Sequence, residues 1–483
     1  MTWMLDPSNR QVYWEPLSPP PGYELDLAVA TTYSLDLQVL IMAAVPMAFG
    51  ALDVEQEGLP DQVQALASLQ RVARRVTVFC QQAQIVPPGK YSRLFGLLEP
   101  VVAEVRAPRG GVFHPKMWLT RYTAEGRDPR YRLVVLSRNL TLDRSWDAMF
   151  VADGSPGHTA RGYRQPLSDF IRTLPDLCVE PLADARRSEI RALSRELDDV
   201  YFPRLEGFSQ MRHGPIGIRG YSSVPSGRAD RRLVISPFLA DHTVTELLAD
   251  VGEGILVSRA DALDRLEEDT LAALDHCRIH YWLDDVADEP SGDEAEEATP
   301  GYEPEAGETL HGLHAKIIVS EQGHLSRMLI GSANATDAAF GNHNVEYCLQ
   351  FTARNEDFSI ESIIPPEPDE DDPAGRGVLN MLMPYQRDEH FTPPPPDLTE
   401  DALRDMREQL VALDLGLAVR SVGEDTWDKG DMGVRCRYAL RFGDLRSEDR
   451  TVARRGDVRQ AFNSPFRPFI LATTSIGQEG LDF

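Results

Sequence analysis

Two similar sets of polar residues stand two hundred positions apart in the chain. They are His114, Lys116, Ser137 and Asn139, the first half-site, and His314, Lys316, Ser332 and Asn334, the second half-site. Residues i and i+2 share one face of a strand, so on a strand each histidine projects beside its lysine. A serine and an asparagine at the end of the next strand then reach the same point. The repeated spacing predicts one site built from two similar halves.

These residue types suit the cleavage of a phosphodiester without a metal. Such a reaction needs a nucleophile, a proton donor for the leaving oxygen and positive charge around the nonbridging oxygens. One imidazole attacks phosphorus, while the other protonates the leaving group and then activates water. The lysines and asparagine amides bind the nonbridging oxygens, and Ser137 and Ser332 are expected to support phosphate binding.

Acidic residues that orient the histidines are the next requirement. Glu346 stands twelve residues after Asn334 and is expected to fix the tautomer of one histidine by a hydrogen bond to the ring. Asp147 is a candidate for the matching role in the first half, although a helix cap or a surface acid is the favoured interpretation there.

Blander interpretations compete with a shared site. Either histidine alone is better explained as a structural residue on a half-buried strand, and only the repetition favours chemistry. A metal centre is an alternative, but the acid ligands at helical spacing that zinc hydrolases show are missing. The lysines would also repel a cation. We therefore expect no metal and no cofactor.

The elements around these residues alternate between strand and helix. Strands are expected at 74–80 and in the segments GVFHPKMWLTRY, YRLVVLSRNL, LHAKIIVSEQ and RMLIGSANAT, and residues 166–200 are expected to be helical. The parallel between 25–200 and 215–353 indicates an internal duplication. The expected fold class is α/β, with two similar α/β/α lobes that share one site at their interface.

The expected organisation has five parts. They are an extended lead-in at 1–24, a first lobe at 25–205, a second lobe at 206–355 with an acidic insertion at 284–308, an acidic and proline-rich linker at 356–400, and a separate segment at 401–483.

Composition is that of a globular protein, with 42% hydrophobic and 26% charged residues. The net charge of -27 includes eleven acidic residues in 284–308 and eight in 356–372, where no lysine or arginine occurs. A basic cleft therefore remains compatible with the acidity. The five widely spaced cysteines, the N-terminus and the lack of a long apolar run predict a cytoplasmic protein with neither signal peptide nor membrane span.

The segments HAKIIVSEQ, MLIGSANAT and NVEYC resemble the His-x-Lys and Gly-Ser-x-Asn signature of the phospholipase D superfamily, and HPKMWLTRY with VVLSRNLT resembles its partner in the first lobe. The superfamily usually has an aspartate five residues after the lysine. Here Arg121 and Glu321 stand there, which makes the chain more similar to the tyrosyl-DNA phosphodiesterases and related bacterial nuclease-like proteins. Arg138, within the first Ser-x-Asn, is a further departure.

The last residues, AFNSPFRPFILATTSIGQEGLDF, look like motif V of superfamily 2 helicases, in the second RecA-like domain. That resemblance implies contact with a nucleic-acid backbone. No phosphate-binding loop of the GxxxxGK[ST] type occurs in the sequence, so we expect no ATP hydrolysis by this chain alone.

The resemblance implies a metal-independent phosphodiesterase that forms a phosphohistidine. Its expected partners are nucleic acid, above all DNA, and a helicase, in bacterial DNA processing or phage defence. Two alternatives stand beside it. One is a phospholipid-hydrolysing enzyme, although no amphipathic helix suited to a membrane surface is apparent. The other is a DNA-binding module whose degenerate first half-site does not cleave.

Overall fold

The computed structural model describes residues 15–49, 62–86, 93–142, 144–157, 165–218, 221, 227–283, 311–365, 378–379, 381–387, 417–421 and 438–442. The chain divides into two compact units, Met1–Val86 with Pro100–Thr392, and Pro87–Glu99 with Pro393–Phe483. The second unit contains a 3-10 helix, Arg93–Leu97, and the antiparallel strands β20 (Leu417–Ser421) and β21 (Tyr438–Phe442). Both predicted half-sites belong to the first unit.

Strands of the first lobe form one sheet. In spatial order its described strands are β10 (Val200–Tyr201), β9 (Met149–Pro156), β7 (Arg127–Leu136), β6 (Met117–Ala124), β1 (Glu24–Thr32), β3 (Val76–Gln81) and β5 (Val102–Val105). The run from β1 to β5 is parallel, and the pairs β1–β6, β6–β7 and β7–β9 are antiparallel.

The second sheet repeats this plan. Its described strands are β11 (Phe208–Ile216), β18 (Glu346–Arg354), β17 (Leu325–Gly331), β16 (Ile317–Gln322), β12 (Ala229–Ile235), β13 (Val251–Ser258), β14 (Arg278–Trp282) and β19 (Leu382–Pro384). The order β18-β17-β16-β12-β13-β14 matches β9-β7-β6-β1-β3-β5, with the same parallel and antiparallel pairs. The α/β class and the internal duplication predicted from the sequence are therefore confirmed.

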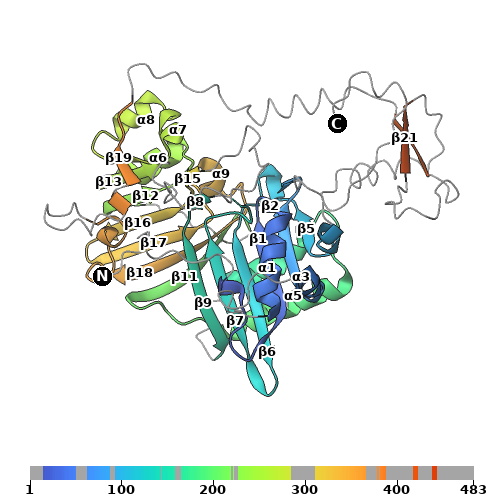
Figure 1. Ribbon diagram of the computed structural model, residues 1–483. Helices are drawn as coiled ribbons and strands as arrows, with labels where there is room; N and C mark the ends of the chain where they lie inside the picture. The colour runs from blue at the N-terminus through green and yellow to red at the C-terminus, as the bar shows by residue number, and fades with distance from the viewer. Residues whose placement is uncertain are drawn as a thin grey trace, which may run out of the picture. The chain divides into compact units, whose positions relative to one another are not determined.

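Helices cover the sheets. They are α1 (Leu37–Phe49), α3 (Gln62–Ala73), α4 (Gln165–Thr173), α5 (Asp184–Glu196), α6 (Asp241–Leu248), α7 (Ala260–Asp264), α8 (Glu268–Ala273) and α9 (Asp337–Phe340). Figure 1 shows α1 beside the strands of the first sheet, and α6, α7 and α8 gathered at the second. None of the helices in the described residues is long and apolar enough to cross a membrane.

One buried core joins the two sheets. It takes in alternate residues of both, together with apolar residues of α4 and α5. Across it, the rings of Phe150 on β9 and Phe351 on β18 lie 5.2 Å apart. A second cluster packs α6 and α7 on the opposite face of the second sheet, through residues such as Val234 and Ile318. The alternation of the strands thus fixes which side chains reach the interface between the lobes.

Short strands complete the junction between the lobes. They are β8 (Arg144–Trp146) of the first lobe and β15 (His311–Leu313) of the second, which pair in parallel. Two further short strands, β2 (Leu35–Asp36) and β4 (Ile85–Val86), pair with each other within the first lobe. Further 3-10 turns lie at Glu15–Leu17, Pro108–Gly110, Leu174–Asp176, Leu197–Asp199 and Ile360–Ser362.

Two segments differ from the sequence-based expectation. Leu382–Pro384 lies within the expected 356–400 linker, yet it forms β19 on the outer edge of β14. Its neighbour Met381 is buried and accepts a hydrogen bond from the Leu283 amide, so apolar burial overrides the linker-like composition. Strand β11 escaped prediction because it contains Arg212, His213 and Pro215, which an edge strand tolerates.

Other expectations fall on parts of the chain outside the described residues. These parts are residues 1–14 of the lead-in, the acidic insertion 284–308 and the helicase-like residues 461–483. Within the described end of the lead-in, Pro16 and Leu17 are buried, and Arg132 of β7 donates hydrogen bonds to the carbonyl oxygens of Pro16 and Ser18.

Candidate active site

Each histidine–lysine pair lies in the three residues that directly precede a strand, rather than within the strand as expected. His114 precedes β6 and His314 precedes β16. The reason is main-chain pairing between the lobes. The His114 amide donates to the Val345 carbonyl oxygen at 2.8 Å, and the His314 amide donates to the Trp146 carbonyl oxygen at 2.8 Å. Each histidine is therefore anchored to the opposite lobe.

Each histidine ring also pairs with an acidic side chain of the opposite lobe. Nδ1 of His114 lies 2.9 Å from Oε2 and 3.0 Å from Oε1 of Glu346, which begins β18 in the second lobe. Nδ1 of His314 lies 3.0 Å from Oδ1 of Asp147, in the first lobe. An ionised carboxylate only accepts, so each Nδ1 carries the proton and Nε2 is left for chemistry.

Asp147 is the main correction to the sequence-based interpretation. It is neither a helix cap nor a surface acid, because its side chain is 10% exposed and holds His314. It lies between β8 and β9, where the pairing of β8 with β15 brings the two lobes together. That pairing is not visible in the sequence.

The two serines have a different position from the expected one at the phosphate. Ser137 Oγ donates to Asp147 Oδ1 at 3.0 Å and accepts from the Ala148 amide at 2.8 Å. Ser332 Oγ likewise donates to Glu346 Oε2 and accepts from the Tyr347 amide. Both hydroxyls are buried and satisfied by these bonds. Each serine thus positions the carboxylate that orients the histidine of the opposite lobe.

A residue two positions before each acid adds a third partner. Ser145 Oγ donates to Asp147 Oδ2 at 3.1 Å, and Asn344 Nδ2 lies 3.4 Å from Glu346 Oε1. Sequence reasoning missed both residues. The available signal was their common spacing from the acid, in Ser-Trp-Asp and Asn-Val-Glu.

The lysines are buried and held by the main chain of their own histidines. Lys116 Nζ donates to the His114 carbonyl oxygen at 2.9 Å, and Lys316 Nζ donates to the His314 carbonyl oxygen at 2.6 Å. Lys316 also crosses the interface and donates to the carbonyl oxygen of Ser137 at 3.2 Å. Two cations are therefore fixed where the two lobes meet.

The asparagines share an unusual feature. Oδ1 of Asn139 and Oδ1 of Asn334 are both buried without a hydrogen-bond partner in the described residues. The backbone after each asparagine is clamped: the Leu140 amide donates to Thr32 Oγ1 at 3.0 Å, and the Ala335 amide donates to Ser236 Oγ at 2.9 Å. In both half-sites the loop thus holds an asparagine whose buried carbonyl oxygen is unpaired in the described residues.

Electrostatics keep the two imidazoles neutral at rest. Burial lowers the pKa of His114 and that of His314, and the nearby lysine ammonium groups act in the same direction against the carboxylates. Burial raises the pKa of Asp147 and Glu346, but their histidine partners outweigh this effect and leave each pKa below its ordinary value. Burial also lowers the pKa of Lys116, and Lys316 adds to the shift.

The two positions where the superfamily usually has aspartate have structural contacts instead. Arg121 pairs with Asp26 and Glu196 in the first lobe. Glu321 is buried, pairs with Arg231 and accepts a hydrogen bond from the Ile360 amide.

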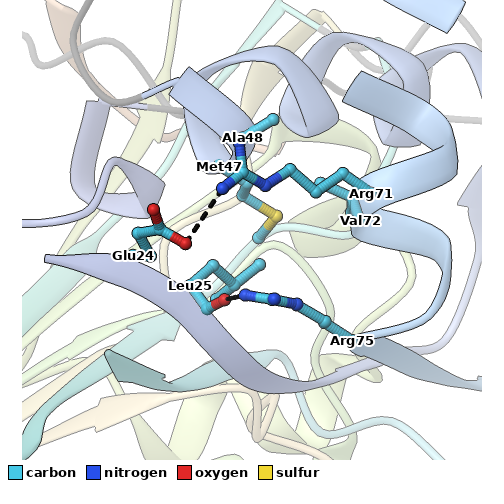
Figure 2. A pocket seen from close by; sticks show the side chains of 7 residues that line it. All are labelled: Glu24, Leu25, Met47, Ala48, Arg71, Val72 and Arg75. Atoms are coloured by element: carbon cyan, nitrogen blue, oxygen red, sulfur yellow. Dashed lines mark hydrogen bonds and ion pairs between the residues drawn. The ribbon is translucent and has the colours of Figure 1, made fainter. Parts of the chain in front are cut away.

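A small pocket lies elsewhere in the first lobe, between the start of β1 and the ends of α1 and α3. Figure 2 shows its lining, with Arg71 reaching Glu24 and Arg75 reaching the carbonyl oxygen of Leu25. The candidate active site contacts the other end of β1, where Thr32 binds the Leu140 amide. A strand rises about 3.3 Å per residue, so Glu24 and Thr32 lie roughly 25 Å apart. This pocket is therefore distinct from the site.

The described residues hold no group of three or more histidine, cysteine, aspartate or glutamate side chains arranged to bind a metal ion.

No protein-family model matches the chain, and a comparison with curated proteins finds no match. Among solved structures, the chain is similar to yeast tyrosyl-DNA phosphodiesterase, with 9% sequence identity and a TM-score of 0.41 over 74% of this chain and 90% of that one. A variant of the same yeast enzyme matches with 9% identity and a TM-score of 0.42, over 73% of this chain and 88% of that chain.

Proposed function

We propose that this protein is a metal-independent phosphodiesterase that cleaves nucleic acid through a phosphohistidine. The observation that carries the proposal is the crossed pairing, in which each histidine meets a buried carboxylate of the opposite lobe at about 3 Å through Nδ1. Two imidazoles oriented in this way, with two fixed lysines, meet the needs of a two-step displacement at phosphorus.

In the first step, Nε2 of one histidine attacks phosphorus and the bond to the leaving oxygen breaks. The leaving oxygen keeps the electron pair and takes a proton from Nε2 of the other histidine. In the second step, that second histidine removes a proton from water, the water oxygen attacks phosphorus, and the nitrogen–phosphorus bond breaks. Following the superfamily resemblance, we assign His114 as the nucleophile and His314 as the acid and base.

The remaining residues stabilise charge. Lys116, Lys316, Asn139 and Asn334 are assigned to the nonbridging oxygens, where negative charge accumulates. The amide Nδ2 of each asparagine is the donor in this role, because Oδ1 only accepts hydrogen bonds and cannot bind an anion. An entering phosphate also favours the protonated form of Lys116 and of His314, whose pKa values are lowered in the free protein, so substrate binds with uptake of a proton.

The choice of DNA, and of bacterial DNA processing or defence beside a helicase, rests on sequence resemblance alone. The helicase-like tail lies outside the described residues, and cytoplasmic localisation stays part of the same proposal. Phospholipid hydrolysis and DNA binding without cleavage are outcomes of the test below rather than second candidates.

The test is cleavage of labelled single- and double-stranded DNA by the full chain in excess EDTA. The proposal expects cleavage to persist, and acid quenching of a His314→Asn variant to leave label on His114. Loss of activity in EDTA with recovery in magnesium or manganese would contradict it. DNA binding without cleavage would support a non-cleaving DNA-binding module. Hydrolysis of phosphatidylcholine vesicles without DNA cleavage would support a phospholipid-hydrolysing enzyme.

A further inference from the structure

One charged residue breaks the symmetry of the two half-sites. The middle position of Ser-x-Asn is Arg138 in the first and Ala333 in the second. The Arg138 side chain is 21% exposed, and its Nε lies 3.7 Å from Asp147 Oδ2. Its Nη2 donates to the Thr141 carbonyl oxygen at 3.0 Å, which holds the guanidinium in place. Ala333 is buried and carries no charge.

The two orienting carboxylates therefore differ in their surroundings. Asp147 meets the Arg138 guanidinium as well as two serine hydroxyls and His314. The hydrogen bonds and ion pair of Glu346 are with His114, Ser332 and the neutral Asn344 amide. A guanidinium beside a carboxylate offsets part of the negative potential of that carboxylate. The carboxylate then stabilises the protonated form of its histidine partner less.

We propose that Arg138 is a positioning residue that makes His314 the proton donor of the pair, by sharing the charge of Asp147 and weakening its hold on the imidazolium. This inference rests on the proposed function. The charged groups that act on His314 are Asp147, Lys316 and Lys116, and Arg138 acts through the first of them. Glu346 faces Lys116, as Asp147 faces Lys316, but in the described residues no guanidinium pairs with it, so His114 keeps more support for the positive charge of a phosphohistidine.

The consequence is a division of labour. The leaving oxygen of a nucleic acid is a strongly basic alkoxide and needs its proton as the bond to phosphorus breaks. A more acidic imidazolium gives that proton more readily. Nε2 of His314 then becomes neutral, the leaving group departs as an alcohol, and the nitrogen–phosphorus bond on His114 remains.

Removal of Arg138 should make His314 a weaker acid. The test uses the full chain and a series of aryl esters of thymidine 3′-phosphate whose leaving groups range from p-nitrophenol to phenol. In Arg138→Ala we expect the alkaline limb of kcat/KM to move up by about 0.5–1 pH unit. On the plateau below that limb, where His314 is protonated in both proteins, single-turnover cleavage of the phenyl ester should fall by up to about tenfold. Cleavage of the p-nitrophenyl ester, which needs little protonation, should stay within about twofold.

Controls separate this role from others. Arg138→Lys should restore most of the wild-type profile, and Arg138→Met replaces the alanine variant if that one fails to fold. Arg259→Ala removes a half-buried cation that lies over Phe238 and should change nothing. An unmoved alkaline limb with a raised KM would mean that Arg138 binds substrate, which overturns the inference alone. Wild-type protein inactive on every ester overturns the proposed function and the inference with it.

Discussion

The half-sites of the first and second lobes share a backbone plan and differ in side chains. In each, a serine or threonine hydroxyl clamps the residue after the asparagine, the lysine binds the carbonyl oxygen of its histidine, and the histidine pairs across the interface. Arginine and aspartate occur in one half where alanine and glutamate occur in the other. The shared plan thus anchors and orients both imidazoles, and the side-chain differences give the two imidazoles different electrostatic surroundings.

The crossed pairing has a further implication. Neither lobe contains a complete histidine–carboxylate pair, since Glu346 serves His114 and Asp147 serves His314. Removing an acid from one lobe must therefore impair the step performed by the other lobe. Each prediction below tests this arrangement, with the largest expected effect first.

Replacing the histidines should give the largest loss. We expect His114→Asn and His314→Asn each to reduce DNA cleavage by about 10⁴-fold or more, because a nucleophile or its proton donor is removed outright. Only His314→Asn should accumulate the phosphoenzyme, measured as acid-labile label after rapid quenching. The matched control is His242→Asn, at an exposed histidine near Asp337, which should keep the wild-type rate. Trapped label in His114→Asn would reverse the assignment.

Replacing the carboxylates should cost less and act crosswise. We expect Glu346→Gln and Asp147→Asn each to lower kcat by roughly 10²–10⁴-fold. The carboxylate then no longer fixes the Nδ1–H tautomer of its histidine or stabilises the imidazolium. Glu346→Gln should slow phosphoenzyme formation even from a p-nitrophenyl ester. Asp147→Asn should spare that substrate and slow cleavage of DNA. A pattern in which each acid affects the histidine of its own lobe would refute the crossed arrangement.

Local sequence patterns predicted those parts of the candidate site that lie within one lobe. His-x-Lys followed by Ser-x-Asn marks strand ends, and β-branched runs such as Val76–Gln81 form the expected strands. What escaped prediction depends on contacts between lobes. Asp147 gained its role from the pairing of β8 with β15, and the serines turned to the acids because buried carboxylates need donors. No pattern within one lobe records such contacts.

The smallest predicted effect is on the free energy of unfolding, where His114 and His314 should contribute similarly to the pH dependence. The pKa of each is lowered in the folded protein, so the unfolded chain binds more protons as the pH falls below about 6.5. This part of the stability is present above that pH and is lost as the pH falls from 6.5 toward the folded pKa. The lowered pKa values of Asp147 and Glu346 extend the loss to lower pH, below their ordinary values of 3.8 and 4.5 respectively.

Each histidine then contributes up to about 1.4 kcal/mol per pH unit to the slope of unfolding free energy against pH. In His114→Asn and His314→Asn that slope, measured by urea unfolding between pH 7.5 and 5, should decrease by a similar amount, and the double variant should lose both contributions. The slope is the useful quantity because any packing defect shifts all pH values alike. If only one buried histidine changes the slope, the other is already charged in the resting protein, and the two half-sites differ before substrate arrives.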